Sequence, residues 1–218
     1  MLIISDFSKT FTTAMMPSTW SAFAKSGILW EDYLAERNAL FDQYFHYEQE
    51  GNIEKTNEWF HLHAALFVKY GLTLAQIQTL VSDNSLYQTR EGVSDFIDAV
   101  RTQGHSLVII SSGFTAVIKA WFDMYHIDYR DIQIIANEFV FDSQGRVISI
   151  GDLTRTPLDK YAGTDSIIEK ADILLGDSPE DIPNSFLWKS YGFTDEEKGF
   201  AVKLGKEASM ETVIQYLK

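Results

Sequence analysis

Met1-Leu-Ile-Ile-Ser-Asp6-Phe-Ser8-Lys-Thr10-Phe-Thr12, the stretch that opens the chain, decides how the fold is interpreted. Its apolar run Leu2–Ile4 predicts a short buried strand, and Asp6 follows at the edge where a parallel sheet binds ligands. Far downstream, the apolar run Ile173–Leu175 also ends in carboxylates, in the segment Gly176-Asp177-Ser-Pro-Glu-Asp181. Two strands that bring Asp residues to one sheet edge predict a site for Mg²⁺ and phosphate.

The composition indicates a globular protein. A length of 218 residues suits one domain with an insert, or one core plus a small cap. The hydrophobic content of 45% and the aromatic content of 14% are ample for a buried core. The net charge of -13, without a basic cluster, argues against a nucleic-acid surface and is explained by ordinary solubility.

The absence of cysteine excludes a disulfide scaffold and a thiol nucleophile, and it fits a reducing compartment. The N-terminus lacks a basic segment followed by a long apolar run, and no run of 18 apolar residues occurs. We therefore expect a cytoplasmic protein that acts on a small metabolite rather than on nucleic acid or a membrane. The oligomeric state is left open.

Strands alternate with helices over residues 90–218, which predicts an α/β fold with a parallel sheet covered on both faces, a three-layer Rossmann-like core. Short apolar runs predict strands at Leu107–Ile110, Ile132–Ala136, Ile173–Leu175 and Ala201–Lys203, a hairpin at Phe139–Phe141 and Val147–Ile150, and helices from Arg90 to near Gly104 and from Thr115 to Met124.

Residues 18–82 are helix-like, with aromatic and aliphatic residues at mixed spacings of three and four. About 80 mainly helical residues thus separate the first strand from the others, which is too long for an ordinary crossover and indicates an inserted helical cap. We assign residues 1–14 and 86–218 to the core and residues 15–85 to the cap.

The carboxyl ends of the predicted strands gather residues suited to phosphoryl transfer. A carboxylate such as Asp6 that attacks a phosphoryl group needs its charge and that of the phosphate neutralised, by Mg²⁺, a lysine or backbone N–H groups. Asp6 and Asp177 match the one or two carboxylates that Mg²⁺ prefers, and Lys160 is the candidate lysine. Lys170 lies at the amino end of its strand, over ~10 Å from the site at about 3.3 Å per residue.

A second group of candidates would hold the substrate. Ser111 can donate to a phosphate oxygen, alongside the N–H groups of Ser112 and Gly113 at the start of the following helix. Lys9 adds positive charge to the loop after the first strand. Arg37 is one of few cations in the cap and could bind a substrate phosphate or carboxylate, although a solvated helix face explains it as well.

Four motifs in this order resemble the haloacid dehalogenase superfamily of phosphohydrolases with an aspartate nucleophile. They are Asp6-Phe-Ser-Lys-Thr10, Ile109-Ile-Ser111-Ser-Gly-Phe-Thr115, Lys160 and Gly176-Asp177-Ser-Pro-Glu-Asp181. Ser111–Thr115 and the later Asn137 to Gly145 segment resemble the phosphoserine phosphatase and pyrimidine 5′-nucleotidase branches, which carry a helical cap after the first strand. The resemblance covers the core, while the cap matches only in position and helicity.

The resemblance implies a role for each matching residue. Asp6 would be the nucleophile and a Mg²⁺ ligand, and residue 8 would be a ligand through its backbone carbonyl. Asp177 would be the second carboxylate ligand. Asp181 would hold metal-bound waters or orient Lys160. The implied activity is Mg²⁺-dependent hydrolysis of a small phosphomonoester through an aspartyl-phosphate on Asp6.

Ser8 departs from the pattern, because related phosphatases have an Asp there that protonates the leaving alkoxide and later activates water. General acid–base catalysis is typically worth ~10²–10⁴-fold, and a serine hydroxyl is a poor substitute near pH 7. The leaving group could need little protonation, another side chain such as one of the cap could supply the proton, or the protein could bind a phosphorylated ligand with low or no turnover. A dehalogenase is disfavoured, because Asp177 and Asp181 suit a metal that such an enzyme does not require.

Two features of the cap have ordinary structural explanations. His61 and His63 are two residues apart and face different directions on a helix, so a metal pair is disfavoured. The aromatic residues of the cap could stack on a ring of the substrate, but such residues more often pack helices together; they are Trp20, Trp30, Tyr33, Trp59 and Phe60.

Overall fold

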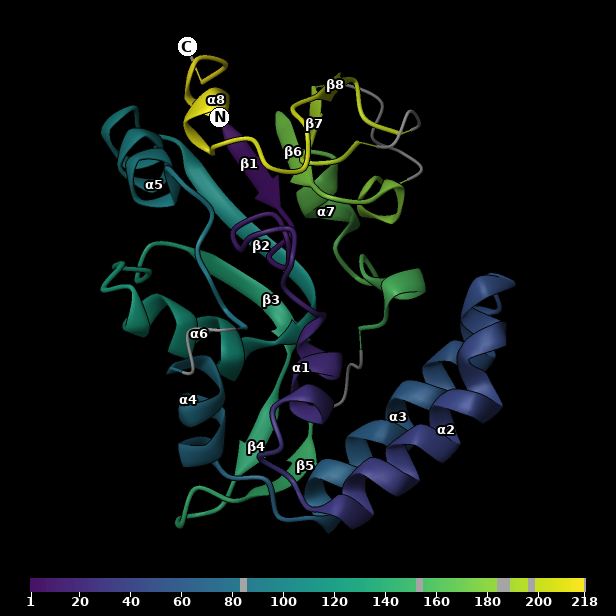
Figure 1. The fold of residues 1–218 in the computed structure, drawn as a ribbon. Coiled ribbons are helices and arrows are strands. Elements are labelled where there is room, and N and C mark those ends of the chain that lie inside the picture. Colours follow the sequence, from purple (N-terminus) through teal and green to yellow (C-terminus); the bar gives the residue numbers. More distant parts are fainter. Residues whose placement is uncertain (83–85, 152–154, 184–188, 196–198, 218) are drawn as a thin grey trace.

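The computed structural model describes residues 1–82, 86–151, 155–183, 189–195 and 199–217 (Figure 1). In these residues a parallel sheet of six strands has the order β3-β2-β1-β6-β7-β8. The strands are β1 (Leu2–Ser5), β2 (Ser106–Phe114), β3 (Gln133–Asn137), β6 (Ile173–Gly176), β7 (Ser190–Gly192) and β8 (Val202–Lys203). Strand β1 lies at the centre, so Asp6 leaves the middle of the sheet between β2 and β6.

Helices cover both faces of the sheet, as the sequence predicts. Successive residues of a strand point to opposite faces, and Ile3 and Ile4 of β1 accordingly belong to two separate apolar clusters. The cluster around Ile3 includes residues of α5 and α6, and the cluster around Ile4 includes Ile168 of α7. The helices of this part are α5 (Val93–Thr102), α6 (Thr115–Met124), α7 (Asp165–Ile168) and α8 (Glu211–Ile214).

The insert after β1 is helical, as expected, and consists of α1 (Thr19–Lys25), α2 (Glu31–Gln49), α3 (Ile53–Lys69) and α4 (Leu74–Ser82). Helices α2 and α3 form a hairpin that extends away from the sheet (Figure 1). The turn between them uses Gly51 at φ 72°, and the Asn52 side chain accepts from the backbone N–H of Lys55 at 3.1 Å. Among the described residues, no helix combines the length and apolarity needed to cross a membrane.

An antiparallel pair, β4 (Phe139–Phe141) and β5 (Val147–Ile150), packs against α3, while α4 packs against α6. Aromatic rings connect these elements: the Trp20 ring lies 4.7 Å from that of Phe60, and the rings of Phe114 and Phe139 stack at 4.0 Å. Trp20, Tyr33, Trp59 and Phe60 are buried in this packing, and Trp30 is 70% exposed. Four of these five aromatic residues therefore pack helices together, as the sequence analysis expects.

Two strands differ from the sequence-based expectation. Strand β2 continues through Ser111 and Gly113 to Phe114, with a register shift against β3, where the sequence indicates a turn. The reason is tertiary, because the extended segment pairs with Asn137 of β3. Strand β7, Ser190–Gly192, was not expected because it contains no apolar run.

Candidate active site

A cavity of about 460 Å³ lies at the carboxyl ends of β1 and β6 and reaches the end of α2. We call Asp6, Lys160, Asp177 and Asp181 the cavity floor, and Phe45, Glu48 and Gln49 the α2 tip. The lining also includes Ser8, Lys9, Ser18, Thr19, Ser112, Pro157, Leu158, Ser178 and Glu180. The structure thus brings together most of the candidate residues that the sequence singles out.

Lys160 links two carboxylates of the cavity floor. Its Nζ donates to Asp6 Oδ1 at 2.5 Å and also to Asp181 Oδ1, and all three side chains are buried. Burial raises the pKa of Asp6 to about 6, although the charge of Lys160 opposes this rise. Burial also disfavours the charged amine, but Asp181 and Asp6 keep the pKa of Lys160 well above its usual value. Lys160 therefore provides a permanent positive charge beside Asp6.

Asp6, Asp177 and Asp181 form a cluster that fits a divalent cation. One ligand oxygen from each lies within 4.8 Å of the others. Burial together with the charges of Asp6 and Asp181 raises the pKa of Asp177 to about 8, so negative charge in the cluster is incompletely compensated. Lys9 Nζ is 3.9 Å from Asp177 Oδ2 but is half-exposed. Hard carboxylate oxygens with excess negative charge are suitable ligands for Mg²⁺.

The loop after β6 folds back so that Asp181 reaches the floor. Asp181 Oδ2 accepts from the N–H groups of Asp177 at 2.8 Å and Ser178 at 3.0 Å. This approach requires glycine at position 176, because a Cβ there would lie 2.5 Å from the Asp181 Cβ. With one oxygen on Lys160 and the other on backbone N–H groups, Asp181 orients both the lysine and the loop that carries Asp177.

Ser112 lines the cavity, whereas Ser111 is buried and its Oγ accepts from the Gly113 N–H at 3.1 Å. Neither Ser112 nor Gly113 lies at the start of a helix, contrary to the sequence-based expectation, because β2 continues to Phe114 and α6 begins at Thr115. Gly113 makes room for α1, since a Cβ there would lie 2.4 Å from Thr19 Oγ1. A role of Ser111, Ser112 and Gly113 in phosphate binding stays a prediction.

A buried polar network, which the sequence analysis missed, connects the end of β2 to the segment that carries Lys160. Asn137 donates to the carbonyls of Ser112 and Arg155, each at 2.9 Å, and accepts from the Arg155 N–H. The Arg155 guanidinium donates to the carbonyls of Lys160 at 2.7 Å and Ala162 at 2.9 Å. Two cavity-lining residues on separate segments are therefore held in a fixed relation by Asn137 and Arg155.

Arg90 fixes the loop that follows Asp6. The sequence pattern indicates only that a helix begins near this residue. Its Nε donates to the Thr10 carbonyl at 2.7 Å, and Nη2 donates to the carbonyl of Lys9. Nη1 donates to the carbonyls of Lys206 and Ala208, each at 2.8 Å. A buried arginine bonded entirely to main-chain carbonyls, four in all, acts as a clamp between distant segments. No local sequence pattern distinguishes it from a surface arginine.

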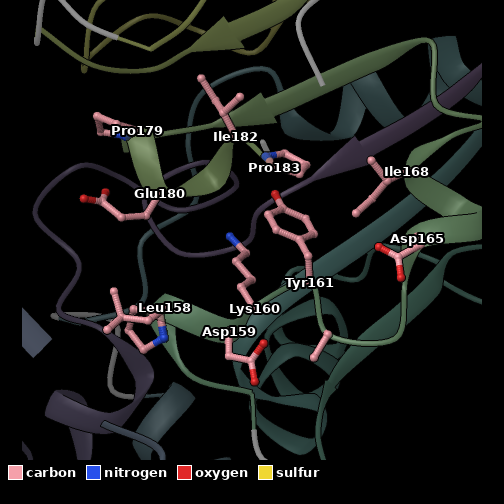
Figure 2. A pocket seen from close by; sticks show the side chains of 12 residues that line it. Leu158, Asp159, Lys160, Tyr161, Asp165, Ile168, Pro179, Glu180, Ile182 and Pro183 are labelled. Atoms are coloured by element: carbon pink, nitrogen blue, oxygen red, sulfur yellow. The ribbon is translucent and has the colours of Figure 1, made fainter. Parts of the chain in front are cut away.

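A larger cavity of about 630 Å³ adjoins the first and shares Lys160 and Glu180 with it. Figure 2 shows Lys160 and Tyr161 rising side by side from their segment toward the loop that carries Pro179 and Glu180. The Tyr161 hydroxyl donates to the Asp181 carbonyl, which further fixes that loop. Lys160 is the one floor residue that lines this second cavity, so the four floor residues come together only in the smaller one.

Arg37 and the two cap histidines lie away from the cavity. Arg37 is eleven residues before Glu48 on α2, about 16 Å along the helix, and stacks over the Phe41 ring at 4.9 Å. The geometry therefore does not favour Arg37 as a substrate ligand. His63 is buried and hydrogen-bonded to the Tyr33 hydroxyl at 3.0 Å, while His61 is exposed, so they form no metal pair.

Comparisons with known proteins bear on the family and the fold of the chain. Residues 3–182 match the family described as pyrimidine 5′-nucleotidase (UMPH-1). The structure of cytosolic 5′-nucleotidase IIIB bound to cytidine superposes with a TM-score of 0.78 at 17% identity, covering 99% of this chain and 86% of that one. A phosphoserine phosphatase, solved as a phospho-aspartyl intermediate analogue, gives 0.62 at 16% identity, covering 100% and 98%.

A phosphoserine phosphohydrolase-like protein from Francisella tularensis subsp. tularensis SCHU S4 gives a TM-score of 0.58 at 17% identity, covering 87% of this chain and 85% of that one. A search by sequence among curated proteins found no match. At these identities the structural likenesses show the fold, and they confirm the predicted three-layer α/β architecture.

Proposed function

The chain belongs to the pyrimidine 5′-nucleotidase (UMPH-1) family of the haloacid dehalogenase superfamily and is a phosphohydrolase, and on this premise we propose that it hydrolyses a small phosphomonoester by way of a phosphoryl group on Asp6. The observation that carries the proposal is the buried contact of 2.5 Å between Asp6 and Lys160 beside two further carboxylates. Residues 15–85 would form the cap that covers the site and selects the substrate.

The cavity floor supplies what an attack by Asp6 requires. One Asp6 oxygen forms the new bond to phosphorus while the bond to the leaving oxygen breaks on the opposite side. Lys160 offsets the charge of the phosphate and holds Asp6 in place through their hydrogen bond. Ser111 and Ser112, at the end of β2, are the proposed donors to the phosphate oxygens. Asp181 keeps Lys160 in position.

Mg²⁺ is the proposed cofactor, with Asp6, Asp177 and the Ser8 backbone carbonyl as ligands and Asp181 beside them. When bound, it would neutralise charge that develops on the phosphoryl oxygens. A cation at this cluster would also lower the pKa values of Asp6 and Asp177 from about 6 and about 8, so that both are ionised at neutral pH.

A pyrimidine nucleoside 5′-monophosphate is the first substrate to consider, because of the family and because a structural neighbour was solved with cytidine. The α2 tip offers a place for the base: the ring of Phe45 lines the cavity and stacks on Phe41 at 4.5 Å. Glu48 and Gln49 add polar groups beside it. Aromatic rings stack on any base, so the choice of base would depend on these polar neighbours.

A second candidate is a protein that binds a phosphorylated ligand with little turnover. Ser8 favours it, because its side chain lines the cavity without an acidic group to protonate the leaving oxygen. Phosphate binding would then still rest on Lys160 and the end of β2.

Phosphate release distinguishes the two candidates. Nucleoside monophosphates, phosphoserine, sugar phosphates and acyl phosphates are supplied with Mg²⁺ or with a chelator, and Asp6→Asn serves as the blank. The proposed enzyme releases phosphate only with Mg²⁺ and intact Asp6. Thermal stabilisation by ligand and Mg²⁺ without any release identifies the binding protein instead.

A further inference from the structure

An alkyl phosphate needs a proton donor at its leaving oxygen, because an alkoxide is a poor leaving group near neutral pH. In-line transfer places that oxygen opposite Asp6, on the side away from β1. The elements that line the cavity without directly following β1 or β2 are the start of α1, the end of α2 and the loops that carry Pro157 and Glu180. A donor must therefore be sought among the acidic groups of these elements.

Most charged groups that line the cavity are already engaged. Asp6 and Asp181 each accept a hydrogen bond from Lys160, and Asp177 lies in the carboxylate cluster beside Lys9. The carboxyls left over are Glu48 of α2 and Glu180, which follows Pro179 in the loop after β6. Among the described residues, neither of these two side chains forms a hydrogen bond or an ion pair.

Glu48 is the better placed of the two. It lies on the last turn of α2, in the cap, whereas Glu180 is next to Asp181 of the floor and also faces the neighbouring cavity. A donor on the cap side of the substrate reaches the leaving oxygen without entering the space of the phosphoryl group. Figure 1 shows the α2–α3 hairpin extending away from the sheet. Helix α3 contacts β5 and the turn at Pro157–Asp159, while α2 packs against α3.

We propose that Glu48 is the general acid and base of the reaction, in place of an acid at position 8; this inference rests on the proposed phosphomonoesterase function. In the first step Asp6 forms the bond to phosphorus, the bond to the leaving oxygen breaks, and that oxygen takes its proton from the Glu48 carboxyl. In the second step a water oxygen bonds to phosphorus, the bond between phosphorus and the Asp6 oxygen breaks, and Glu48, now ionised, takes the proton that this water loses. Phosphate leaves, and both residues return to their starting states.

The electrostatic surroundings support this role. Burial, together with the nearby charge of Glu180, raises the pKa of Glu48. The other charged groups lining the cavity are Asp6, Lys9, Lys160, Asp177 and Asp181. A carboxyl with a raised pKa retains more of its protonated form near neutral pH, as a general acid requires.

The test compares leaving groups in Glu48→Gln. Hydrolysis of a nucleoside monophosphate, whose leaving alkoxide needs a proton, is measured beside hydrolysis of a nitrophenyl phosphate, whose leaving group needs almost none. We expect kcat for the nucleotide to fall about 10²-fold or more, with a much smaller fall for the aryl ester. Glu50→Gln is the matched control, because Glu50 is exposed at the same helix end and does not line the cavity.

A second variant separates proton transfer from folding and binding. Ser8→Asp, which supplies a carboxyl from the floor side, should restore much of the nucleotide activity that Glu48→Gln loses. Equal losses for both substrates, or a change in KM alone, would overturn the proposal and make Glu48 a binding residue. Unchanged kcat for both would also overturn it. If the unmodified protein releases phosphate from neither substrate, the proposed function itself fails.

Discussion

The cavity floor and the α2 tip face the same space but are built in opposite ways. Asp6, Lys160 and Asp181 of the floor are buried, and the lysine donates to both carboxylates. Asn137 and Arg155 hold the segment that carries the lysine. The side chains of the α2 tip are half-buried or exposed. In the proposed function, the floor would fix the position of the phosphoryl group, while the tip would contact the rest of the substrate.

Among the hydrogen bonds of the described residues, a single residue near the start of α3 joins the hairpin to the segment that carries Lys160. Asn57 of α3 accepts from the Thr156 hydroxyl at 2.9 Å and donates to Asp159 Oδ2 at 3.4 Å. Thr156 lies four residues before Lys160 in the chain, and Asp159 lies directly before it. A movement of the hairpin can therefore shift the segment that carries Lys160.

The largest expected effect comes from breaking the floor at its nucleophile. Asp6→Asn keeps the shape of the side chain but replaces a carboxylate with a far weaker nucleophile, so phosphate release should fall to background. Steady-state assays with the best substrate of the panel measure it. Retained thermal unfolding cooperativity serves as the control, and undiminished turnover in the variant would remove Asp6 from the mechanism.

The next effect comes from removing the charge of the floor. Lys160→Met leaves the Asp6 and Asp181 carboxylates buried without their cation, which should lower kcat by about 10²–10³-fold. The pKa of Asp6 should rise further, so the acidic limb of the pH–rate profile should move to higher pH. Lys170→Met is the matched control, because Lys170 is exposed at the amino end of β6. Equal activity and equal pH profiles for both variants would show that Lys160 has no catalytic part.

A smaller effect concerns the free energy of unfolding and a buried histidine of α3. Burial and the charge of Arg37 lower the pKa of His63 to about 3, below its unfolded value of ~6.5. The unfolded chain therefore binds a proton that the folded chain does not, and stability is lost as the pH falls below about 6.5. Between pH 7 and pH 5 this costs about 2 kcal/mol.

Urea denaturation at both pH values checks this cost in two variants of α3. His63→Phe should lose about 2 kcal/mol less than the unmodified protein between pH 7 and pH 5. His61→Gln, which changes an exposed histidine of the same helix, should leave the pH dependence as it is. A His63→Phe variant with an unaltered pH dependence would place the acid sensitivity elsewhere.

The smallest expected effect comes from removing the hydrogen bonds between the hairpin and the segment that carries Lys160. Asn57→Ala removes two hydrogen bonds to the Lys160 segment, which should cost about 1 kcal/mol and raise KM a few-fold with little change in kcat. Asn38→Ala, an exposed position on α2, is the control. A large fall in kcat for Asn57→Ala would mean that the hairpin positions Lys160 rather than the substrate.

The sequence could predict the three carboxylates of the floor because each lies in a segment that directly follows a strand. The apolar runs before Asp6 and Asp177 locate strand ends, and parallel strands bring their carboxyl ends to one edge. Lys160 follows no strand and was placed by its resemblance to a known motif. The alternation of strands and helices likewise predicts the layers of the core.

The supporting residues could not be predicted, since their partners are distant main-chain groups. Asn137 and Arg155 are 18 residues apart, and Arg90 bonds to carbonyls up to 118 residues away. Glu48 was not recognised as a site residue, because its position at the cavity depends on how the hairpin packs. Arg37 is one of few cations in the helical insert, but charge alone does not reveal which way a helix faces.

The most direct test of Asp6 as the nucleophile is to trap its phosphorylated form. The protein is mixed with its best substrate and Mg²⁺, quenched in acid, and digested with trypsin to give the peptide Met1–Lys9. We expect a phosphoryl group on this peptide that hydroxylamine removes, as for an acyl phosphate, and that is absent in Asp6→Asn. An active protein whose peptide carries no phosphate, or carries it in a hydroxylamine-resistant form on Ser8, would contradict catalysis through Asp6.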